Sequence, residues 1–144
     1  KLVESQVFYD KTNQLPVFRI SKQGEKIEVD YYTALDTINS ISINVGFIGG
    51  VERLHKYCDS LYYANFSEEN YNEVNVRVPY SILLDNELRV REVHILQRLP
   101  LYKYDEKYDY DSLIKKILLS TDGQWFKKDK ENNWYLYVGL FHLK

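Results

Sequence analysis

Residues 74–98 carry the pattern that most restricts how this chain can fold. Apolar or aromatic residues occupy every second position in the first half of the stretch: Val74, Val76, Val78, Tyr80, Ile82 and Leu84. After the polar turn 85–87, the pattern resumes from Leu88. Because successive side chains of a strand point to opposite faces, this stretch predicts a long antiparallel hairpin.

Two irregularities interrupt the predicted hairpin. The apolar phase shifts by one residue near Arg91-Glu92, which indicates a β-bulge or a strong local twist. Pro79 cannot donate a ladder hydrogen bond, which favours an edge position or a second irregularity. Together these features predict that one strand of the hairpin lies at the edge of its sheet, where a partner chain could add a strand.

The rest of the chain predicts an α+β fold with mostly antiparallel strands and about three helices packed on one face of the sheet. Short polar turns join most of the strands, as only antiparallel neighbours allow. The other strands are expected at 7–9, 15–20 and 27–32, as a three-stranded antiparallel meander, and at 41–45, 125–127 and 134–141, with the last two paired as a hairpin. The helices are expected at 33–40, at 51–66 and from Asp111 onward. The second of them has apolar residues on one face, namely Val51, Leu54, Cys58, Leu61 and Tyr62.

Length and composition fit a single α+β domain spanning residues 1–144. The hydrophobic fraction of 44% and the charged fraction of 28% are those of an ordinary globular chain. A net charge of −2 offers little attraction for phosphate and argues against a dedicated nucleic-acid binder. No apolar run is long enough to cross a bilayer, so no membrane insertion is expected within these residues.

The sequence is compatible with more than one cellular compartment. Cys58 is the only cysteine, so an intrachain disulfide is excluded. That fits the cytoplasm, but it also fits an envelope or extracellular domain without disulfides. The chain starts at Lys1 without Met, so we expect that an N-terminal segment has been removed.

Tyrosine is unusually abundant, with 14 residues in 144. Its ring buries like an apolar group while its hydroxyl needs a partner or water, which suits contact surfaces between proteins. We therefore expect a non-enzymatic protein-interaction module with a protein partner and no cofactor. Its expected contact residues are four tyrosines of one polar segment and three arginines of the hairpin: Tyr102, Tyr104, Tyr108, Tyr110, Arg77, Arg89 and Arg91.

The alternative from another class is a small enzyme or ligand-binding domain with a pocket between the sheet and the helices. It would use His94 as an acid–base group, because a histidine within an apolar strand is unusual. A concave pocket containing His94 beside a carboxylate would favour this alternative. Weak nucleic-acid binding through Tyr80 and the hairpin arginines is the second alternative.

Three smaller clusters each allow a chemical and a structural interpretation. His55 and Cys58 are three residues apart on one expected helix. They could form a thiol with a base or half of a metal site, or they could be a buried thiol beside a surface imidazole. The acidic residues of 105–111 could bind a hard cation, but they also suit a solvated loop with a helix cap. Gly46, Gly49 and Gly50 precede an expected helix, so they could form an anion-binding helix start or a turn with positive φ. No metal site is expected.

Overall fold

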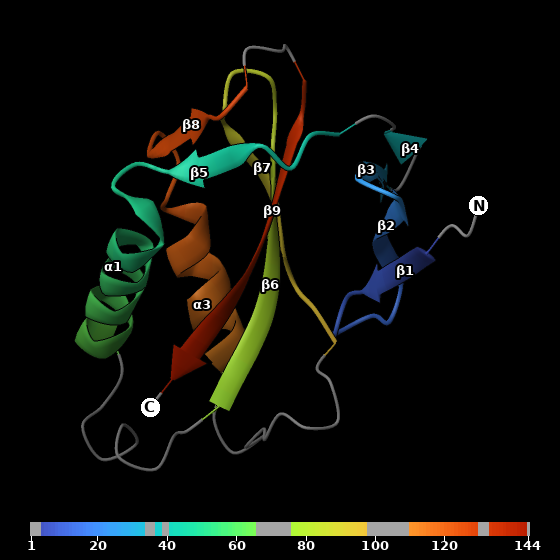
Figure 1. Ribbon diagram of the computed structural model, residues 1–144. Coiled ribbons are helices and arrows are strands. Elements are labelled where there is room, and N and C mark those ends of the chain that lie inside the picture. Colours follow the sequence, from blue (N-terminus) through green and yellow to red (C-terminus); the bar gives the residue numbers. More distant parts are fainter. Residues whose placement is uncertain are drawn as a thin grey trace.

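The computed structural model describes residues 4–33, 37–38, 41–65, 76–97, 110–129 and 133–143. This part of the chain has an α+β fold with mostly antiparallel sheets, and it contains two helices (Figure 1). The strands are β1 (Glu4–Tyr9), β2 (Pro16–Gln23), β3 (Lys26–Tyr32), β4 (Thr37–Ile38), β5 (Val45–Phe47), β6 (Val76–Leu84), β7 (Val90–Ile95), β8 (Trp125–Lys127) and β9 (Tyr135–Leu143). The helices are α1 (Gly50–Asn65) and α3 (Tyr110–Leu119).

The strands form three sheets. β1, β2, β3 and β4 pair in that order, as the expected meander extended by one short strand. β6 lies between β7 and β9 in a three-stranded central sheet, and β5 pairs with β8 in a separate ribbon. In Figure 1 the meander lies on one side of the central sheet, and the two helices lie on the other.

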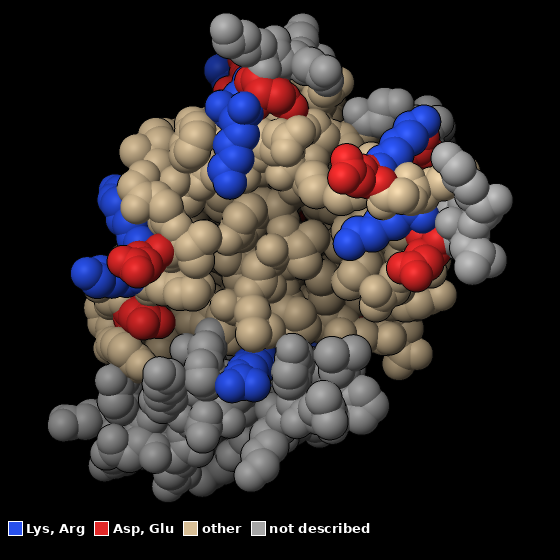
Figure 2. All heavy atoms as spheres, in the orientation of Figure 1, with Lys and Arg blue, Asp and Glu red and all other residues tan. Residues whose placement is uncertain are grey.

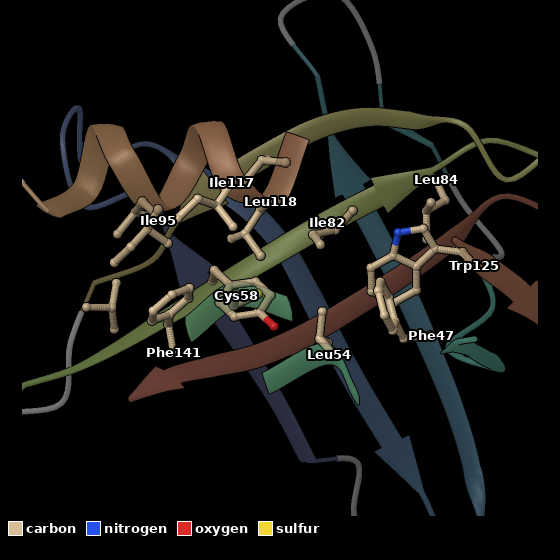
Figure 3. Close-up of a cluster of buried hydrophobic side chains, with 14 of the residues drawn as sticks. Phe47, Leu54, Cys58, Ile82, Leu84, Ile95, Ile117, Leu118, Trp125 and Phe141 are labelled. Atoms are coloured by element: carbon tan, nitrogen blue, oxygen red, sulfur yellow. The ribbon is translucent and has the colours of Figure 1, made fainter. Parts of the chain in front are cut away.

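The central strand β6 is buried on both faces from Tyr80 to Leu84, because its side chains alternate between two cores. Val78, Tyr80, Ile82 and Leu84 of β6 belong to a core shared with α1, α3 and the β5–β8 ribbon, part of which Figure 3 shows. Leu83 belongs to a second core, which β2, β3 and Leu136 of β9 complete. The expectation that the helices share one face of a sheet is therefore met, and the meander covers the opposite face.

Helix α1 follows the predicted apolar spacing, with one exception. Leu54, Cys58 and Tyr62 are buried at intervals of four residues, as one helix face requires. Val51 was expected on the same face, but it is 55% exposed. Gly49 and Gly50 have φ angles of 91° and 88°, so the turn interpretation is confirmed for these two glycines. Gly46 lies within β5 instead and has no positive φ.

Two predicted elements are wrong. A helix was expected over 33–40, but Thr37 and Ile38 form β4 and pair with Tyr32 and Tyr31. Pairing with β3 overrides the weak helical spacing, because β-branched residues such as these suit a strand. The described chain therefore has two helices instead of about three.

The expected C-terminal hairpin is the second error. β8 pairs with β5, whereas β9 pairs along its whole length with β6, from Tyr135↔Leu84 to Leu143↔Val76. β6 offers nine consecutive partners and β8 has only three residues. The longer ladder satisfies more backbone groups.

The hairpin of β6 and β7 has the predicted bulge. Leu83 pairs with Glu92 and Leu84 with Val90, so Arg91 is the extra residue. β7 is an edge strand of the central sheet, but Pro79 lies in the central strand β6. The Pro79 carbonyl accepts a hydrogen bond from the Leu96 N–H (2.9 Å), so its nitrogen also faces β7, just beyond the last ladder pair, Tyr80↔Ile95. Its missing N–H therefore costs no bond to β9.

Candidate functional site

The predicted contact tyrosines lie mostly outside the described residues. Tyr102, Tyr104 and Tyr108 fall there, and Tyr110 is the first residue of α3, with its side chain not described. Their role in partner binding stays a prediction. Four other tyrosines are fully buried core residues, namely Tyr31, Tyr62, Tyr80 and Tyr135. Much of the tyrosine content thus serves packing within the two cores.

The predicted arginines are exposed, and two of them are matched by nearby acids. Arg89 Nε lies 3.6 Å from Glu87 Oε2, and Arg91 Nε lies 3.2 Å from Asp85 Oδ2. Arg91 Cζ also lies 5.9 Å from the centre of the Trp134 ring. Both arginines therefore contact residues of their own chain near the β6–β7 turn. Arg77 is exposed near the start of β6, where it pairs with His142 of β9.

The edge of β7 is largely occupied by other parts of the chain. The Val90 N–H donates to Asp122 Oδ1 at one end (2.9 Å), and the Ile95 carbonyl accepts from the Lys11 N–H at the other (2.9 Å). Between them, Val93 alone has both its N–H and its C=O directed away from β6, as the alternation of the ladder requires. The hairpin edge that the sequence indicated as a docking place is therefore short.

Within the described residues, the edge of β9 is unpaired over a longer stretch. The Ser42 N–H donates to the Trp134 carbonyl and the Leu136 N–H donates to the Ser42 carbonyl, both at 2.9 Å. The backbone groups of Trp134 and Leu136 therefore face away from β6. By alternation, Val138, Leu140 and His142 face the same way. No other strand of the described chain pairs with β9 there. The sequence showed the strand but assigned it to β8, so this edge was missed.

A hollow of about 220 Å³ lies beside this edge, between β9 and α1. His55, Cys58, Asp59 and Tyr63 line it from α1, together with Tyr80, Leu140 and Phe141. Burial and the nearby Asp59 charge raise the pKa of the Cys58 thiol to about 12, so no thiolate forms at neutral pH. Cys58 is therefore a buried apolar residue, which agrees with the structural interpretation of the His55–Cys58 pair.

His94 lies in a separate cleft of about 460 Å³ between the meander, β7 and α3. Its Nδ1 lies 2.7 Å from Asp10 Oδ2, and its Nε2 lies 3.0 Å from Glu92 Oε1. The Tyr31 hydroxyl donates to the same Glu92 oxygen at 2.9 Å. His94 thus lines a concave cleft beside carboxylates, which is the arrangement that favours the enzymatic alternative. However, both ring nitrogens are already engaged by carboxylates.

The His94 cluster joins the meander to the central sheet, and its charges affect two neighbouring groups. Burial tends to raise the pKa of the Asp10 carboxyl, but the hydrogen bonds from His94 and from the Thr12 and Asn13 amides outweigh it, so the pKa lies below the ordinary value of 3.8. Burial, followed by the Glu92 charge, raises the pKa of the Tyr31 hydroxyl. Tyr31 therefore stays protonated as a donor.

Asp10→Ala is expected to destabilise the fold at neutral pH by about 1.5–3 kcal/mol, the usual contribution of a hydrogen bond to a charged group. A carboxyl with a lowered pKa stabilises the fold above its unfolded value, and this contribution is lost as the pH falls through the folded value. The difference between wild type and variant should therefore shrink below about pH 4. Urea unfolding from pH 7 to pH 3 measures it, with the exposed Glu25→Gln as a control. A difference independent of pH would contradict the charged role of Asp10.

Three further findings limit the chemistry of the described residues. They include no group of three or more His, Cys, Asp or Glu that could hold a metal ion. The acidic segment 105–109 lies outside them, while Asp111 lies in the first turn of α3 and pairs with Lys11. Among the described helices, none is long and apolar enough to cross a membrane.

Comparison with known proteins adds no identification. No protein family, no curated protein and no solved structure matches this chain.

Proposed function

We propose that this chain is a protein-interaction module that binds an extended segment of a partner protein as an added strand along β9. The observation that carries the proposal is the row of outward-facing backbone groups from Val138 to His142, which no other described strand pairs with. An unpaired edge of this kind accepts a peptide through main-chain hydrogen bonds, and adjacent hollows select its side chains.

The surroundings of the edge support a mainly apolar contact. Val138 is 39% exposed, and Leu140 and Phe141 line the hollow beside α1. Figure 2 shows that charged side chains gather at the rim of this face and leave its middle, over β9, uncharged. An apolar side chain of the bound segment would occupy the hollow between β9 and α1.

A charged side chain at one end of the site indicates the charge that the bound segment carries there. Arg77 pairs in register with His142 at one end of the open edge, and its side chain is exposed. It therefore favours an acidic residue at that end of the bound segment. Arg89 and Arg91 are engaged by Glu87 and Asp85 across the sheet, so we give them no part in this contact.

Val138→Pro tests the proposal. The N–H of Val138 faces away from β6, so proline removes a donor of the open edge and no hydrogen bond of the β6–β9 ladder. Peptides selected from a random library on the wild-type protein should bind the variant at least about tenfold more weakly, a loss of about 1.4 kcal/mol. Fluorescence anisotropy with the selected peptides measures the affinity.

Val7→Pro is the matched control, because it places the same residue at the outer edge of the meander. It should leave peptide binding unchanged. Equal losses in the two variants would indicate a general effect on folding. Full affinity in Val138→Pro, with an unchanged melting temperature, would overturn the proposed site.

A second candidate function is small-ligand binding or acid–base catalysis in the His94 cleft. The position of His94 between Asp10 and Glu92 favours it. Nuclear magnetic resonance with a fragment library should then show shifts confined to the cleft, which His94→Gln abolishes. The absence of such shifts in the wild-type protein would remove this candidate.

A further inference from the structure

β1 is the outer strand of the meander sheet and pairs with β2 alone within the described chain. The Asp10 N–H donates to the Leu15 carbonyl, toward β2, whereas the Tyr9 carbonyl accepts from the Gln97 N–H on the opposite side (both 2.9 Å). The irregularity near Tyr9 leaves Val17 of β2 as the unpaired residue, so β1 itself alternates regularly. The N–H and C=O groups of Ser5 and Val7 therefore face outward.

The usual protections of a sheet edge are weak along this strand. Natural edge strands carry lysine, proline or inward-facing charges that prevent pairing with another chain. β1 contains no proline and one charged residue, Glu4, which stands opposite Lys22 of its own sheet. Within the strand, Ser5 and Gln6 are exposed and add no charge.

We infer that β1 is a self-association surface, on which a second copy of this chain pairs its own β1 antiparallel around a two-fold axis at Gln6. Ser5 of each copy then pairs with Val7 of the other, so that the outward-facing groups meet in both directions. Gln6 faces Gln6, and Glu4 faces Phe8, so no like charges oppose each other. A register centred on Val7 would instead place Glu4 opposite Asp10, which is unfavourable.

The contact is short and its affinity should be low. Interfaces below about 1,000 Å² are typical of weak, transient association. Sedimentation should therefore show monomer at low micromolar concentration and an increasing dimer fraction at high concentration. Val7→Pro removes an outward donor without touching the β1–β2 ladder, and it should abolish the dimer, whereas Val138→Pro should leave it intact.

Cysteine pairing tests the register directly. In the inferred dimer the two Gln6 residues form a non-hydrogen-bonded pair, with Cα atoms about 4.5 Å apart, within the range of a disulfide. Gln6→Cys should therefore cross-link rapidly under mild oxidation. Ser5→Cys is the matched control: Ser5 is also exposed, but its symmetry mate lies about 7–8 Å away, beyond that range. Cys58 is buried and protonated, so it does not compete.

The relative cross-linking rates of the two cysteine variants distinguish the inferred dimer from random collision. Fast cross-linking of Gln6→Cys together with slow cross-linking of Ser5→Cys supports the two-fold pairing. Equal rates for the two variants, or a wild-type protein that stays monomeric at high concentration, would overturn it. Neither result depends on peptide binding at β9.

Discussion

Gly139→Val is expected to lower the free energy of unfolding by about 3 kcal/mol, at the upper end of the usual cost of overpacking a core. A Cβ atom at Gly139 would lie 2.5 Å from both Cζ and Oη of Tyr80, and 3.0 Å from Cε2 of Tyr137. Tyr80 is 2% exposed, and its ring lies 6.3 Å from that of Tyr137 in the core. Any shift of the Tyr80 ring, which also lines the hollow beside α1, would disturb its packing in the core.

Urea unfolding of the single and double variants checks this explanation. Tyr80→Leu removes the atoms that a side chain at 139 would meet, so Gly139→Val should cost much less in that background. Equal costs in the two backgrounds would show that the clash with Tyr80 is not the cause. Gly24→Ala is a poor control, since Gly24 has a φ of 63° and strains any side chain.

Leu54→Ala is expected to destabilise the protein by about 2–5 kcal/mol, as for other large-to-small core substitutions. Leu54 has no exposed surface and packs in the core between α1 and the central sheet (Figure 3). Val51→Ala, one turn earlier on the same helix, is the control. Because Val51 is 55% exposed, it should change the stability by less than about 0.5 kcal/mol.

Denaturant titration of the two variants compares the faces of α1. Leu54→Ala should be the more costly substitution, because Leu54 faces the core and Val51 faces solvent. If Val51→Ala proved the more costly change, the helix would be rotated about its axis relative to the arrangement described here. The side chains facing the hollow beside β9 would then differ as well.

Elements with strong local alternation were predictable from the sequence, and elements whose partner is distant were not. The phase shift at Arg91-Glu92 identified the bulge, because the period of two leaves no other way to keep both halves of the hairpin in one sheet. The pairing of β9 with β6 was not predictable, since alternation defines a strand but not its neighbour. The same holds for Thr37 and Ile38, which become a strand through contact with β3.

The open edge of β9 was missed for the same reason. An edge exists only once the neighbours of every strand are known, and the sequence placed β9 beside β8. His94 was indicated by its unusual place in an apolar strand, and the structure does bring it to a cleft with Asp10 and Glu92. Asp10, from the end of β1, had no local signal that linked it to His94.

The position of β6 also has a consequence for the order in which the protein folds during synthesis. β6 and β7 emerge from the ribosome well before β9, yet β9 is the neighbour that completes the central sheet. Until then, one side of β6 exposes unpaired backbone groups beside apolar side chains, as in other folds that depend on distant contacts. The nascent chain should therefore bind chaperones until the residues from Tyr135 onward have left the exit tunnel.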